Sequence, residues 1–203
     1  MGRCSDARDR LLATMAALLH ERGYTALSVS DICASAGLKK GSFYHFFESK
    51  QALALAALES YAEHNRAHLR EMLSASGSVH NKLEGMFKAM YEGYRSQCEG
   101  DGQALGCPIG NLAGEMAGRN AEITAKLESI FGEWREGLRQ LLTQGVESGE
   151  LDVTDPAAAA ESLVAFLEGA ALLARTMSDP EIIRRTGERA LSLLGPPIPA
   201  ASA

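Results

Sequence analysis

The chain has 203 residues, of which 46% are hydrophobic and 23% are charged, so it can bury a sizeable core in one large domain or two small ones. No segment approaches the unbroken apolar run of about 20 residues that a membrane span needs. The N-terminus does not have the pattern of a signal peptide, so we expect a soluble, cytoplasmic protein with no membrane partner.

Three helical patterns follow one another in the first fifty residues. The first has one apolar face, formed by Leu11, Leu12, Met15, Leu18 and Leu19. Gly23 follows where a helix end favours positive φ. Ser28 and Asp31 have the spacing of a capping box, which predicts the start of a second helix, and Gly37 predicts its end. A third helix is expected from about Lys39 to Phe47.

Further helical patterns fill the rest of the chain. We expect helices at 49–72, 82–96, from Pro108 onward with Cys107 as the cap, at 121–147, at 157–177 and at 180–194. A Gly-rich loop is expected at 99–106. No stretch alternates with a period of two, so the sequence predicts an all-α fold.

The spacing of the second and third helices is typical of a helix-turn-helix. The major groove of DNA admits one α-helix, which needs small residues for close approach and donors for phosphates. The third helix offers both, while Phe43 is expected to point into the core. The candidate residues for DNA contact are Lys39, Lys40, Gly41, Ser42, Tyr44 and His45.

This region resembles the TetR-type repressors. The residues that carry the resemblance are 28–38 (SVSDICASAGL), Gly41-Ser42-Phe43-Tyr44, Phe47, Ser49-Lys50 and Leu53. The resemblance implies that the third helix lies in the groove and that Ser28 and Lys50 hold the flanking DNA backbone. The alternative is a structural three-helix head with a solvated basic face.

The charge distribution agrees with a DNA-binding head. The net charge of −6 taken alone argues against nucleic acid, but residues 1–50 hold seven Lys/Arg against five Asp/Glu, while 51–203 hold thirteen against twenty-one. Together with this charge distribution, the resemblance implies a helix-turn-helix DNA-binding domain at 1–50 and a helical ligand-binding and dimerisation domain at 51–195, and we expect a flexible tail at 196–203.

One head contacts few base pairs, so we expect a homodimer that reads two half-sites of operator DNA roughly 34–36 Å apart. The resemblance implies that the last two helices pair across the two-fold axis. The residues expected at this dimer interface are Leu163, Leu167, Ala170, Leu173, Ala174, Ile183, Leu191 and Leu194. The alternative is a stripe that is buried entirely within one chain.

The four cysteines, Cys4, Cys33, Cys98 and Cys107, have no paired spacing, and we expect free thiols. The segment Gly106–Leu112 resembles a Gly-Cys-x-x-Gly-Asn stretch of a TetR branch in which some members respond to electrophiles or oxidants. A thiol at a helix N-terminus favours the nucleophilic thiolate. No Lys, Arg or His is adjacent, however, so a packing or ligand-lining role for Cys107 is the alternative, and we place it ahead of covalent sensing.

Residues from several predicted helices are candidates for an effector site. By the architecture of the family they are Phe87, Met90, Tyr91, Tyr94, Cys107, Asn111, Met116, Trp134 and Phe166. Their apolar character suits a small apolar or electrophilic effector.

An enzyme or a metal-binding protein is the rival class. His64 and His68 are four residues apart, a spacing that can hold a metal, but no third ligand is placed by the sequence. No dinucleotide fingerprint or catalytic triad is present. We expect no enzymatic activity, no metal and no cofactor.

Overall fold

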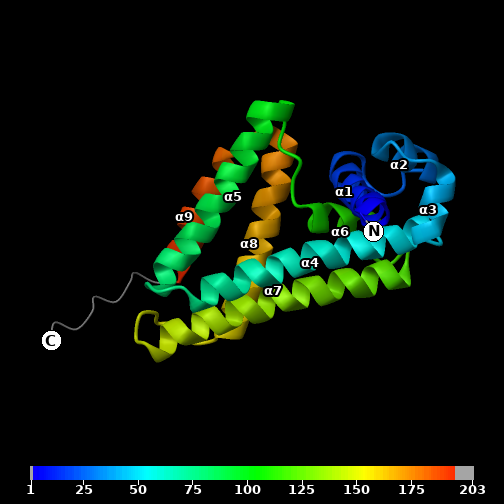
Figure 1. The fold of residues 1–203 in the computed structure, drawn as a ribbon. Helices are drawn as coiled ribbons and strands as arrows, with labels where there is room; N and C mark the ends of the chain where they lie inside the picture. Colours follow the sequence, from blue (N-terminus) through cyan, green and yellow to red (C-terminus); the bar gives the residue numbers. More distant parts are fainter. Residues whose placement is uncertain (1, 195–203) are drawn as a thin grey trace. The chain divides into compact units, whose positions relative to one another are not determined.

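The computed structural model describes residues 2–194, which form nine α-helices and no strand (Figure 1). In chain order the helices are α1 (Gly2–Arg22), α2 (Val29–Ala36), α3 (Lys40–Phe46), α4 (Lys50–Ser74), α5 (Val79–Asp101), α6 (Pro108–Met116), α7 (Ala121–Glu147), α8 (Pro156–Met177) and α9 (Glu181–Leu193). The predicted all-α fold is confirmed. The predicted tail at 196–203 and the side chain of Cys4 lie outside the described residues.

The α5 helix is longer than the sequence predicted. It begins at Val79, where the Ser78 hydroxyl accepts a hydrogen bond from the backbone N–H of Asn81 at 3.1 Å. It ends only at Gly102, whose φ of +74° stops the helix. The loop expected at 99–106 is therefore shorter, because polar residues without apolar periodicity continue the last turns of α5.

The described residues divide into two compact units. The first unit comprises the residues up to Asn65 together with Cys107–Ser129, so it contains more than the three N-terminal helices. Its fully buried side chains include Leu11, Met15, Ile32, Phe43, Leu53, Ile109 and Ile123. Side-chain hydrogen bonds join α4 to α7 within this unit, from Gln51 to Glu122 at 2.8 Å and from Lys126 to Glu59.

The second unit comprises Arg66–Gly106 and the described residues from Ile130 onward. In this unit α9 packs against both α5 and α8. Gly187 of α9 lies against Phe87 of α5 so closely that a Cβ there would be 2.7 Å from the ring. The core cluster consists of Val79, Leu83, Phe87, Leu138, Leu141, Leu142, Leu151, Ala160, Leu163, Val164, Ala190, Leu191 and Leu194.

One helix within residues 2–194, α8, is long and apolar enough by length and composition to cross a membrane. This property of α8 was not predicted from the sequence. Its side chains at Ala160, Leu163 and Val164 belong to the core cluster of the second unit.

Candidate nucleic-acid interface

The α2 helix begins and ends as its sequence predicted. The Ser28 hydroxyl accepts from the Asp31 N–H at 3.2 Å, and the Asp31 carboxylate accepts from the Ser28 N–H at 2.9 Å. The Ser28 hydroxyl also donates to the Asp31 carboxylate, and this hydrogen bond, together with the one from the Ser28 N–H, holds the pKa of the exposed Asp31 below its usual value. Gly37 closes the helix with a φ of +63°. The predicted capping box is confirmed, and it engages the hydroxyl of a residue that we also expected at the DNA backbone.

The α3 helix is anchored by one buried ring and presents its polar side chains to solvent. Phe43 is fully buried, as predicted, whereas the adjacent Tyr44 is 58% exposed. Lys39, Lys40, Gly41 and His45 are exposed as well, and Ser42 is half-buried. Small and donor residues therefore line the accessible face of a single short helix, which is what a groove-binding helix needs.

Lys50, at the start of α4, is directed at the turn between α1 and α2 (residues 23–27). Its ammonium group donates to the carbonyl oxygens of Tyr24 at 2.9 Å and of Leu27 at 2.7 Å. Burial lowers the pKa of Lys50, and the charge of Glu115 opposes this shift. Two of its three donors are thus used within the first unit, and the contact with DNA that we expected for Lys50 stays a prediction.

Two further residues, which no sequence pattern indicated, join α6 to the turn at 23–27 and α1 to the end of α2. Glu115 of α6 accepts hydrogen bonds from the backbone N–H groups of Tyr24 and Thr25. The guanidinium of Arg10 in α1 donates to the carbonyl oxygens of Ala36 and Gly37 at the end of α2. No sequence signal identified either residue, because each acts on backbone groups that are far away along the chain.

The expected ligand residues are divided between the two units. Cys107, Asn111 and Met116 belong to the first unit, and the remaining candidates to the second. Phe87, Tyr94 and Met116 are buried, while Trp134 and Phe166 pack as partly buried residues against the core cluster. The candidates Met90, Tyr91, Cys107 and Asn111 are half-buried.

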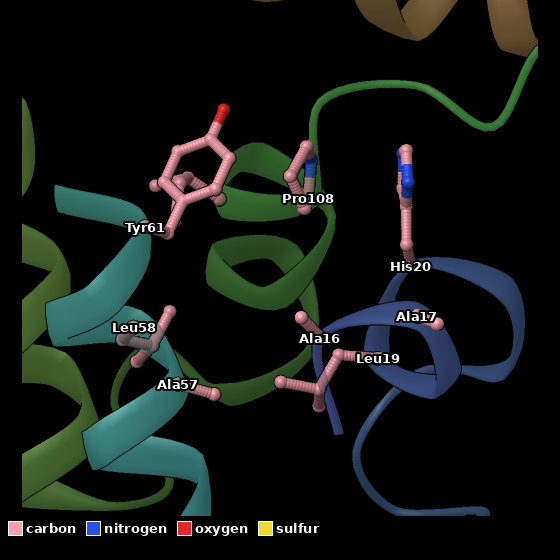
Figure 2. A pocket seen from close by; sticks show the side chains of 9 residues that line it. Ala16, Ala17, Leu19, His20, Ala57, Leu58, Tyr61 and Pro108 are labelled. Atoms are coloured by element: carbon pink, nitrogen blue, oxygen red, sulfur yellow. The ribbon is translucent and has the colours of Figure 1, made fainter. Parts of the chain in front are cut away.

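A cleft of about 270 Å³ lies within the first unit, between α1, α4 and α6. Figure 2 shows side chains of α1 on one side, those of α4 on the other, and Pro108 of α6 between them. Its lining residues are Ala16, Ala17, Leu19, His20, Ala57, Leu58, Tyr61, Pro108 and Ile109. None of the expected ligand residues lines it, although Pro108 directly follows Cys107. Its lining suits a small apolar group with one polar end at His20 or Tyr61.

The cap of α6 is the one that the sequence predicted. The Cys107 sulfur accepts a hydrogen bond from the N–H of Gly110 at 3.5 Å, and Pro108 occupies the first turn. Cys33, Cys98 and Cys107 are all free thiols. Cys33 is buried, and burial raises the pKa of its thiol, although the charge of Lys40 opposes this.

Most residues that were expected at the dimer interface are buried within the single chain. They are Leu163, Ala170, Ala174, Ile183, Leu191 and Leu194. Leu173 remains 45% exposed, and Leu167 is half-buried. The large apolar side chains that α8 exposes are Leu172, Leu173 and Met177. Some of the expected interface residues, such as Leu163 and Leu191, therefore belong to the core of the second unit, whereas Leu173 remains accessible to solvent.

The side chains of His64 and His68 are exposed on α4. Among the residues that the structure describes, no group of three or more His, Cys, Asp or Glu side chains is arranged to hold a metal ion.

Two family profiles match the chain. The one described as "Bacterial regulatory proteins, tetR family" matches residues 11–57, and "Tetracyclin repressor-like, C-terminal domain" matches residues 82–189. Together they span both the helix-turn-helix and most of the remaining helices.

Characterised relatives agree with these profiles. The chain is 31% identical over 145 residues to the HTH-type transcriptional repressor NemR of Escherichia coli K12, which covers 71% of this chain and 69% of that protein. It is 32% identical over 168 residues to the repressor DhaR of Mycobacterium sp. GP1, covering 81% of this chain and 80% of that protein.

Solved structures have the same fold. The reduced form of E. coli NemR superposes with a TM-score of 0.83 at 25% identity, covering 94% of this chain and 98% of that one. A TetR regulator from Chloroflexus aurantiacus superposes with a TM-score of 0.80 at 31% identity, covering 95% and 96%. The chain therefore belongs to the TetR family of DNA-binding transcriptional repressors.

Proposed function

We propose that this protein is a cytoplasmic, homodimeric repressor that binds operator DNA through α3 and is released by a small molecule. The observation that carries the DNA contact is the division of α3 into the buried ring of Phe43 and the exposed Tyr44 beside it. The exposed face has donors at Lys39, Lys40 and His45, which suit phosphates and base edges.

The family supports the remaining parts of this proposal. TetR regulators bind operator DNA and effectors as dimers, so two heads read two half-sites. We assign DNA binding to residues 1–50 and effector binding and dimerisation to 51–195. Release then needs only that the effector binds more tightly to the conformation that fits DNA poorly. The apolar and aromatic character of the expected ligand residues favours a small apolar or electrophilic effector.

Fluorescence anisotropy with a labelled duplex from upstream of its own gene tests the DNA contact. We expect the wild-type protein to bind at low ionic strength and to lose affinity as salt is added, because released counterions favour binding less at high salt. Lys40→Ala is expected to bind less tightly and to reduce the salt dependence by about one ion. A wild-type protein that does not bind this duplex at low salt contradicts the proposal.

A thiol switch at Cys107 is the second candidate. It is favoured by the position of Cys107 at the α6 N-terminus, where its sulfur already accepts the N–H of Gly110. A relative whose solved structure is described as the reduced form also supports it. In this version of the function, modification of the thiol replaces reversible binding of an effector.

Alkylation separates the two candidates. The thiolate displaces iodide from iodoacetamide and leaves a stable thioether, and Cys107→Ser cannot react there. Release of the wild-type protein but not of Cys107→Ser identifies the thiol as the switch. Release of both, or of neither, rules it out. Peptide mass spectrometry checks the site, and we expect Cys33 to react slowly because it is buried and burial raises the pKa of its thiol.

A further inference from the structure

A single carboxylate from α6 holds the turn between α1 and α2. Glu115 Oε2 accepts from the N–H of Tyr24 at 2.7 Å, and Oε1 accepts from the N–H of Thr25 at 2.6 Å. The Thr25 hydroxyl also donates to Oε1. Both oxygens are therefore engaged, and all three donors come from two consecutive residues of the turn.

The turn is shaped for this carboxylate. Gly23 has a φ of +77°, and a Cβ at this position would lie 2.7 Å from Glu115 Oε2. A larger residue there would be strained and would also displace the carboxylate. The close approach of Glu115 thus depends on a glycine that ends α1.

Lys50 engages the acceptors of the same turn. Its ammonium group accounts for the carbonyl oxygens of Tyr24 and Leu27, while Glu115 accounts for the N–H groups of Tyr24 and Thr25. Two N–H groups and two carbonyl oxygens of the turn are therefore bound by opposite charges, and charged hydrogen bonds are stronger than neutral ones.

The next residue after this turn is Ser28, the cap of α2. The path of the turn consequently sets where α2 starts and the direction of α2 relative to α1. The α3 helix follows α2 after a short connection. A binding surface that is already ordered loses less entropy on association.

We propose that Glu115 is a positioning residue for DNA binding, which fixes the α1–α2 turn and thereby the orientation of α2 and α3 before DNA is bound. This inference rests on the proposed contact between α3 and operator DNA. It assigns to α6 a direct part in operator affinity without any contact between Glu115 and DNA.

The substitution Glu115→Gln tests the inference, because electrostatics and the positioning role predict opposite changes in DNA affinity. It removes a negative charge from the DNA-binding unit, so electrostatics alone predicts tighter binding. The positioning role predicts weaker binding, by about tenfold, because the charged hydrogen bonds to the turn are lost. Glu128→Gln is the matched control, since Glu128 is an exposed glutamate of α7 in the same unit. We expect it to bind DNA as tightly as the wild type or slightly more tightly.

Amide hydrogen exchange supplies an independent reading. In Glu115→Gln the N–H groups of Tyr24 and Thr25 are expected to exchange at least several-fold faster than in the wild type, because the amide is a poorer acceptor. The salt dependence of DNA binding should not change, since no phosphate contact is lost. Glu115→Asp keeps the charge but shortens the side chain, and we expect it to weaken DNA binding too.

Wild-type affinity or tighter binding in Glu115→Gln, in a protein that circular dichroism shows to be folded at the temperature of the assay, overturns the inference. So does unchanged exchange of both N–H groups. If the wild-type protein itself does not bind the duplex, the proposed contact of α3 with DNA fails instead, and exchange at Tyr24 and Thr25 then decides whether Glu115 holds the turn.

Discussion

The ammonium group of Lys50 lies 4.0 Å from the centre of the Tyr24 ring and donates a hydrogen bond to the carbonyl oxygen of the same residue. A cation in this position interacts with the ring face as well as with the backbone. The first residue of α4 therefore binds the turn that follows α1. Lys50 thus has a structural role beside the contact with DNA that the family resemblance implies.

Replacing Lys50 with Met keeps most of the side-chain length and removes the charge. We expect the variant to lose about 1–3 kcal/mol of unfolding free energy, because two carbonyl oxygens lose their charged donor. Urea denaturation followed by circular dichroism measures this loss. Lys40→Met, at an exposed position in α3, is the control and should leave stability within about 0.5 kcal/mol of the wild type. Equal stability of the two variants would contradict the structural role of Lys50.

Tyr44→Ala is expected to weaken operator binding about tenfold, because it removes the largest exposed side chain of α3. The thermal midpoint should stay close to that of the wild type, since 58% of the side chain is already in solvent. Anisotropy with the upstream duplex and a thermal melt measure the two effects. Tyr44→Phe separates the hydroxyl from the ring. Undiminished affinity in Tyr44→Ala would show that this face of α3 does not contact DNA.

Leu172→Glu and Leu173→Glu are expected to convert a dimer into folded monomers. Both side chains are exposed in the single chain, at 61% and 45%, so a charge is tolerated in the monomer but not in an apolar interface. Size-exclusion chromatography with light scattering measures the mass. Val146→Glu, at an exposed apolar position on α7, is the control and should leave the oligomer intact. Dimers that survive both α8 substitutions would place the interface elsewhere.

The Glu115 contact is expected to weaken in acid. Burial raises the pKa of Glu115, but the hydrogen bonds from Thr25 and Tyr24 and the charge of Lys50 outweigh it, so its pKa lies below the usual value. A carboxyl with a lowered pKa stabilises the folded state above its unfolded pKa, and this contribution is lost as the pH falls through the folded value.

Thermal melts of the wild type and Glu115→Gln should therefore differ near neutral pH, and the difference should shrink as the pH falls from neutral through the lowered pKa of Glu115. Comparing the two proteins at each pH removes the effects of the other carboxylates. A difference that stays constant across this range would mean that the charge of Glu115 contributes nothing to the fold.

Local chemistry was readable in the sequence wherever a short segment determines its own backbone. The Ser28–Asp31 capping box, the end of α2 at Gly37, the Cys107 cap with Pro108 after it and the buried ring of Phe43 all appear as predicted. The caps and the helix end each depend on residues within one helical turn, so pattern and spacing are sufficient to predict them. The TetR motif lies in this same local part of the chain.

Only the tertiary structure decided which apolar residues of α8 and α9 are buried and which remain outside. An apolar stripe indicates that a helix face is buried but not which element buries it. Ala174 and Ile183 were therefore expected at a partner subunit and lie in the core of the chain, while Leu172 and Met177 are exposed. The same is true of Glu115, Lys50 and Arg10, whose partners are backbone groups of distant residues. Backbone N–H and C=O groups are present at every residue, so the sequence carries no mark of which of them a distant charge will bind, and only the packing of α1, α4 and α6 determines it.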